Sequence, residues 1–79
     1  MKWINFKDKQ PKYKHIILVS MHMPAYEKNR PKFKILEPIN ILGNSCWKEQ
    51  GNDSLFDIKT NEYFLGMCGA YTIKWLKLD

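Results

Sequence analysis

The residues best suited to binding chemistry are the basic ones of a short segment in the first half of the chain. Four cations occur there within seven positions, and two aromatic residues accompany them. Basic side chains hold phosphates and aromatic rings stack on bases, so this composition indicates a surface for an anionic ligand. The alternative is a solvated edge strand whose lysines prevent edge-to-edge pairing. The candidates are Lys28, Arg30, Lys32 and Lys34, with Tyr26 and Phe33 as stacking residues.

A second basic set precedes the first apolar run. It consists of Lys7, Lys9, Lys12 and Lys14, with Tyr13 between the last two. If the two basic segments pair, their fields merge into one patch that attracts anionic partners. As isolated surface lysines they would only keep the protein soluble. We include Lys12 and Lys14 among the candidate contacts.

The charge of the chain is uneven along its length. Residues 1–34 carry nine of the thirteen basic residues and a net charge of +7, whereas residues 35–79 carry −2. Whether the positive end becomes a positive face depends on the fold.

Three tryptophans are candidates either for the core or for an interface. Buried Trp is common in small domains, and Trp is also enriched at binding hot spots. Trp3 and Trp75 are expected in the core, where Trp usually lies in so small a domain. Trp47 has polar neighbours, so we keep it as a candidate contact.

Neither a metal site nor a catalytic site is expected. His15 and His22 are seven positions apart across an apolar run, which places them on opposite faces of a strand. Cys46 and Cys68 are 22 positions apart and lack a partner at ligand spacing, so reduced thiols are the simplest interpretation. The chain contains no recognisable catalytic motif or phosphate-binding glycine loop, and we expect neither an enzyme nor a cofactor.

The apolar pattern predicts one domain over residues 1–79, mainly β (or α+β). A strand is predicted at 15–22, and its aliphatic run at 16–19 favours a central strand covered on both faces. Alternation at 33–41 predicts two short strands separated at Pro38, and Gly43 with Asn44 predicts a turn. Further strands are expected at 46–48, at 63–67 after a hairpin turn at 60–62, and at 71–75. Asp53 or Ser54 could cap a short helix at 55–59.

These elements fit a small single antiparallel sheet or a partly closed barrel with at most one short helix. A chain of 79 residues buries only about 60% of its unfolded surface, so a homodimer would enlarge a thin core. The longest plausible apolar run, at 16–19, is far short of a membrane span, and no signal-peptide pattern opens the chain. We expect a soluble, intracellular protein that does not bind membranes.

The two ends of the chain carry a resemblance to a known family. Trp3, Ile4, Asp8 and Pro11 form an opening that is followed by the apolar run at 16–19 and by Trp47. With the ending at 73–78, this pattern resembles the phage and prophage family called domain of unknown function five-five-one. The chain departs from it at Lys74, where the family has histidine, and at Lys77, where it has proline. Residues 22–60 do not align. The resemblance implies a phage-encoded accessory protein in the bacterial cytoplasm and transfers no catalytic residue.

The sequence therefore predicts a non-catalytic binding protein. The expected role is that of a phage-type accessory factor that inhibits or sequesters a component of a bacterial defence system through a basic surface with aromatic residues. Its partner would be a host protein, a nucleoprotein complex or an anionic nucleotide. The alternative function is direct binding of DNA or RNA.

Overall fold

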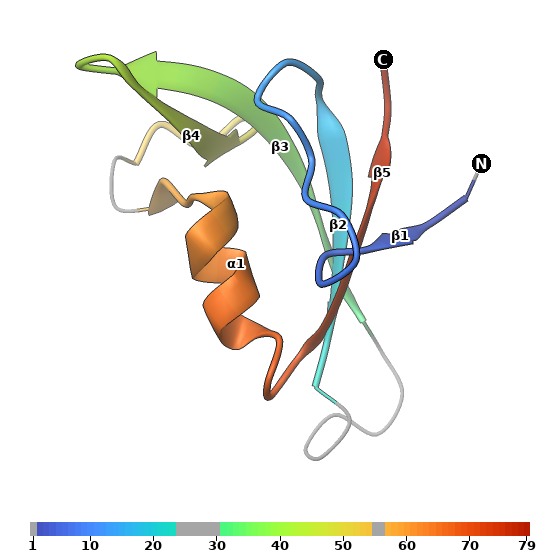
Figure 1. Cartoon of the computed structure of the whole chain (residues 1–79). Helices are drawn as coiled ribbons and strands as arrows, with labels where there is room; N and C mark the ends of the chain where they lie inside the picture. The colour runs from blue at the N-terminus through green and yellow to red at the C-terminus, as the bar shows by residue number, and fades with distance from the viewer. Residues whose placement is uncertain (1, 24–30, 55–56) are drawn as a thin grey trace.

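The computed structural model describes residues 2–23, 31–54 and 57–79, which form one antiparallel sheet with one helix against it (Figure 1). The strand order is β1-β5-β2-β3-β4. The elements are β1 (Ile4–Asn5), β2 (Ile17–His22), β3 (Lys32–Ile41), β4 (Asn44–Glu49), α1 (Asn61–Met67) and β5 (Thr72–Lys77). The prediction of a mainly β domain with a small antiparallel sheet and at most one short helix is confirmed. The sheet is open, so the barrel alternative is wrong.

The hydrophobic core lies between the sheet and α1. Ile17 and Val19 of β2 and Ile73 of β5 are almost fully buried, as alternation along half-covered strands requires. From α1, Phe64 packs against Phe6, with 5.2 Å between the ring centroids. Phe6 belongs to the segment after β1, so this segment shares the helix side of the sheet with α1 (Figure 1).

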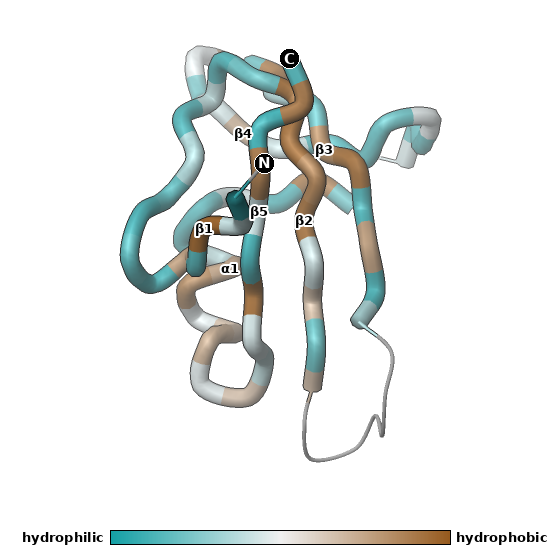
Figure 2. Tube along the Cα trace, turned by 90° about the vertical axis from the view of Figure 1, so that its right-hand side faces the viewer, coloured by the Kyte–Doolittle hydropathy of each residue, from teal (hydrophilic) through white to brown (hydrophobic). Residues whose placement is uncertain are grey.

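The strand register assigns alternate residues to two very different faces. Leu18 pairs with Ile35 on one side and with Leu76 on the other, so these three side chains point away from the core. Figure 2 looks onto this surface, with β5, β2 and β3 side by side and α1 behind them. We call it the open face, and the side that carries α1 the helix side. The prediction that the strand at 16–19 is covered on both faces is wrong, because α1 covers one face only.

Pro38 does not interrupt its strand, contrary to the prediction of two short strands. β3 runs through it, and Pro38 pairs with Trp47 of β4. The backbone N–H and C=O of Trp47 both bond to Lys59, at 2.6 and 2.9 Å, so the Pro38–Trp47 pair exchanges no hydrogen bond. The backbone nitrogen of Pro38, which has no N–H, therefore faces the β2 side of the strand, where the pairing of β2 with β3 has already ended at Leu36. The proline costs the ladder nothing.

The predicted hairpin at 60–62 and strand at 63–67 are also wrong, because these residues form the start and body of α1. Thr60 is the N-cap, and its Oγ1 accepts from the backbone N–H of Tyr63 at 3.3 Å. Glu62 adds an acidic group to the first turn. Phe64 and Cys68, four positions apart, both face the core. Across the described ranges, no helix combines the length and hydropathy needed to cross a membrane.

Candidate anion-binding pocket

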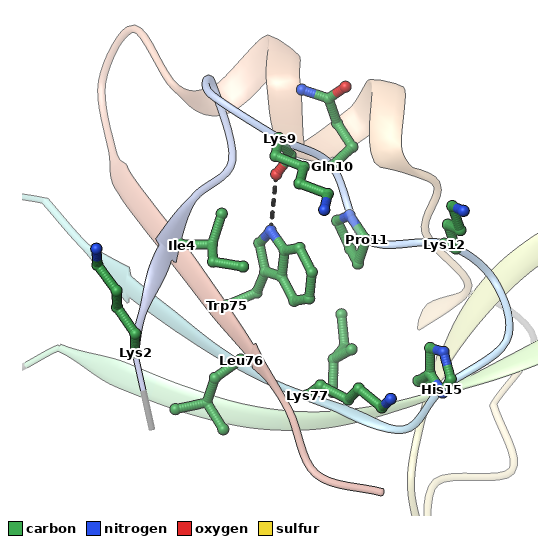
Figure 3. A pocket seen from close by; sticks show the side chains of 11 residues that line it. Lys2, Ile4, Lys9, Gln10, Pro11, Lys12, His15, Trp75, Leu76 and Lys77 are labelled. Atoms are coloured by element: carbon green, nitrogen blue, oxygen red, sulfur yellow. Dashed lines mark hydrogen bonds between the residues drawn. The ribbon is translucent and has the colours of Figure 1, made fainter.

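A pocket of about 420 Å³ lies on the helix side of the sheet, beyond the part that α1 covers (Figure 3). Side chains of the strands form its floor, and residues 9–15 of the segment between β1 and β2, which we call the N-terminal loop, form its opposite wall. Its volume is within the range of ligand sites, roughly 300–1,000 Å³. The lining residues are Lys2, Ile4, Lys9, Gln10, Pro11, Lys12, His15, Ile17, Trp75, Leu76 and Lys77.

The floor of the pocket is apolar and continuous with the core. Ile4 pairs with Trp75 across β1 and β5, which places both side chains on the helix side. Trp75 and Ile17 are both buried, so the floor is a packed surface whose shape is fixed before a ligand binds. In Figure 3, Ile4 and Pro11 lie on either side of the Trp75 ring.

Trp75 also fixes the N-terminal loop. Its indole Nε1–H donates to the backbone carbonyl oxygen of Lys9 at 2.8 Å (Figure 3). One residue further on, Gln10 Nε2 donates to the carbonyl oxygen of Phe6 at 2.6 Å. These two bonds hold the backbone that carries Lys9 next to the floor of the pocket.

Asn61, the first residue of α1, connects the loop to the helix. Its Nδ2 donates to the carbonyl oxygen of Pro11 at 2.8 Å, and its backbone N–H donates to the hydroxyl oxygen of Tyr13 at the same distance. Its Oδ1 accepts from Nε1 of the buried Trp47 at 2.7 Å. One side chain thus links α1, β4 and the N-terminal loop, and it fixes the loop on either side of Lys12.

The charge around the pocket is strongly positive. Four lysines contribute to its lining, and among the described residues that line it none is acidic. The lysines are Lys2, Lys9, Lys12 and Lys77. A carboxylate contacts one lining residue from outside the pocket: Oδ1 of Asp79 lies 3.4 Å from Nδ1 of His15 and accepts from the backbone N–H of Ile16 at 3.1 Å. Several cations around an apolar floor form a site that can hold an anion with an apolar part.

Of the basic segment predicted at 28–34, the described residues Lys32 and Lys34 do not line this pocket. Lys12 lines it, whereas Lys14 is exposed nearby and does not. Lys34 lies in a separate hollow of about 60 Å³ whose lining includes Glu49 and Asp57. Its Nζ is 3.9 Å from Oε2 of Glu49. The strand that carries Lys34 therefore offers a partly neutralised surface.

The other residues predicted to contact a ligand lie in different parts of the structure. Lys32 is exposed and shares the helix side of β3 with Lys34, as the alternation predicts, while Phe33 is on the open face. Trp47 is fully buried, which removes it as a contact. The prediction failed there because polar neighbours in sequence do not determine exposure. Lys28, Arg30 and Tyr26 lie outside the described residues.

Two lysines of the pocket, Lys77 and Lys2, belong to neither of the predicted basic segments. Lys77 is two positions after Trp75, so the alternation of the last strand could have placed it on the same side. Lys2 has no such pattern, because its position depends on the pairing of the two-residue strand β1 with β5. The apolar floor required the full strand order to be known.

Comparisons with protein-family models, with curated proteins and with solved structures each found no significant match to this chain.

Proposed function

We propose that this chain is a non-catalytic binding protein that holds an anionic nucleotide in the pocket beneath the N-terminal loop. The observation that carries the proposal is that Lys2, Lys9, Lys12 and Lys77 all line one pocket with an apolar floor. These four lysines come from the N-terminal end, the loop and β5, so the fold assembles the site from segments far apart in sequence.

The mixed character of the lining favours a nucleotide over a bare inorganic anion. Ammonium groups would bind phosphate oxygens through charge-assisted hydrogen bonds. A base or ribose would cover Ile4, Pro11 and the edge of Trp75, which a small ion would leave in contact with water. A ligand with both a phosphate and a base contacts the lysines as well as the apolar floor of the pocket.

The proposal is binding without turnover, which the composition of the lining supports. Among the described residues of the lining there is neither a carboxylate nor a thiol or hydroxyl nucleophile. Lysines and an apolar floor can hold and desolvate a phosphate ester. His15 is the lining side chain suited to general-base chemistry, and its Nδ1 lies 3.4 Å from Oδ1 of Asp79.

The wider biological role belongs to the same proposal. A phage-type accessory factor that captures a nucleotide would inhibit a bacterial defence system by removing the signal that the system needs. This part rests on the resemblance of the two chain ends described above, while the ligand class rests on the pocket.

The proposal is tested by calorimetric titration with guanosine and adenosine monophosphates, with inorganic phosphate and with a single-stranded oligonucleotide. The variant Lys9→Gln/Lys12→Gln should lose roughly 100-fold or more in nucleotide affinity, since each charged hydrogen bond contributes about 1.5–3 kcal/mol. The matched control Lys32→Gln/Lys34→Gln removes the same charge from β3 and should bind as the wild type does.

Three outcomes would contradict the proposal. Equal losses in both variants would mean that net charge, and not the pocket, determines affinity. Binding of the oligonucleotide alone, with a steep salt dependence, would instead support the DNA- or RNA-binding alternative. Absence of binding by all the probes would exclude a nucleotide site of this class.

A further inference from the structure

The open face carries an apolar surface that no element of the described chain covers. Phe33 is 56% exposed and Ile35 is 39% exposed, and they are neighbours on the open face of β3. Half-buried Leu18 extends the surface to β2. Leu76 of β5 has the same register but is only 8% exposed, so it adds little to the exposed surface. Grouped apolar side chains of this kind on a soluble protein mark an interaction surface.

Two aromatic rings lie across the middle of this surface. The ring centroids of Trp3 and Phe33 are 6.2 Å apart, although Trp3 precedes β1 and Phe33 is on β3. Because β5 and β2 lie between those strands, the two side chains must lean over the sheet toward each other. Together they form a broad aromatic ridge, and aromatic residues are the commonest anchors of protein interfaces.

The charge on this face is low for such a basic protein. The register places Lys48 and Glu37 opposite each other on it, and Lys74 beside Ser20. Among the described strand residues of the open face these are the formal charges, and they sum to +1, whereas the whole chain has +5. A polyanion would find few cations here, but a second +5 molecule could approach without strong repulsion.

We infer that a second copy of this chain covers the open face, so that two sheets pack face to face in a homodimer. A face of a molecule with extents of 38 × 27 × 22 Å has an area on the order of 600–1,000 Å², and stable interfaces bury roughly 800 Å² per partner. The face carries both an acid and bases, so Glu37 of one copy can meet a lysine of the other. Such packing would also add a second core to a chain too short to build a large one.

The dimer leaves the proposed nucleotide pocket accessible. Ile4, Ile17 and Trp75 line that pocket from the helix side, opposite the surface that the second copy covers. The two inferences share only Leu76, which lines the pocket and has the register of the open face, and each can fail without the other.

The test is the molar mass in solution, measured by light scattering and sedimentation equilibrium over a range of protein concentrations. The full chain should be a dimer, and Phe33→Lys should raise the dissociation constant by roughly 30-fold or more, as expected for a central aromatic anchor. Ile35→Lys is a second variant with the same expected direction. Leu65→Lys is the matched control, since Leu65 on α1 is 38% exposed and lies on the helix side.

Circular dichroism shows whether each variant is folded, and Phe33→Lys replaces a side chain that is already more than half exposed. Dissociation by the open-face variants with an intact Leu65→Lys dimer supports the inference. A monomeric wild type at every concentration would overturn it. Two other results would overturn it too, because another surface would then hold the copies together. One is a dimer that persists in both folded open-face variants. The other is a folded Leu65→Lys variant whose dimer dissociates as easily as theirs.

Discussion

The two faces of the sheet are built from alternate residues of the same strands, yet they do different things. On the helix side, Val19 and Ile73 are buried under α1, and the part that α1 leaves uncovered becomes a pocket rimmed by lysines. On the open face, Leu18 and Ile35 have no layer above them and few charges around them. One layer of strands thus separates the proposed anion site from the proposed dimer surface.

The largest difference between the faces should appear when one tryptophan from each is truncated. Trp75→Ala removes a buried ring and the bond to the Lys9 carbonyl, so the free energy of unfolding should fall by about 3–5 kcal/mol. Trp3→Ala, on the half-buried open side, should cost clearly less in the monomer. Denaturant unfolding at low protein concentration measures both. Equal losses would mean that the open face contributes to the monomer core as strongly as the helix side does.

A smaller effect is expected from Asn61→Ala, which tests how the helix side holds its loop. The substitution removes the partners of Trp47 Nε1 and of the Pro11 carbonyl, and the free energy of unfolding should fall by about 1–3 kcal/mol. Nucleotide affinity should fall as well, because the loop that carries Lys12 loses its anchor. Asn40→Ala is the control, since Asn40 makes an exposed bond to the Gly43 N–H at the far hairpin. Unchanged affinity in folded Asn61→Ala would show that the loop does not need this anchor.

The smallest effect should come from a residue outside both surfaces. Leu42, at the tip of the β3–β4 hairpin, is 97% exposed and has a φ of 50°, followed by Gly43 at 85°. Two positive φ values favour Asn-Gly, and Leu in this conformation is strained. Leu42→Asn should therefore raise the free energy of unfolding by about 1 kcal/mol, without changing nucleotide affinity or dimer mass. Lower stability would contradict this view of the turn.

The sequence predicted the parts of the fold that depend on local pattern. The strands of residues 17–22 and 72–77 follow from β-branched residues and alternation, and the turn at Gly43 follows from its chemistry. It failed at Pro38 and at 60–67, where the outcome depends on what neighbouring segments do: the end of pairing with β2 in one case, and the contacts of Asn61 and Phe64 in the other.

The candidate site was predicted only in its chemistry. A basic surface with an aromatic component was expected, and Lys12 is part of the pocket. Its other members could not be grouped from spacing, because Lys2, Lys12 and Lys77 meet only through the pairing of β1 with β5 and the path of the N-terminal loop. The more densely charged strand segment was favoured instead, and there Lys34 is accompanied by Glu49.

The most direct measurement of the central claim uses the three indole N–H signals of a ¹⁵N-labelled sample as internal reporters. Trp75 lies in the pocket floor, Trp47 is buried under Asn61, and Trp3 is on the open face. During titration with guanosine or adenosine monophosphate, the Trp75 signal should shift and saturate while the Trp3 and Trp47 signals stay in place. A saturable shift of Trp3 alone, or no shift of Trp75 at saturating nucleotide, would contradict the account.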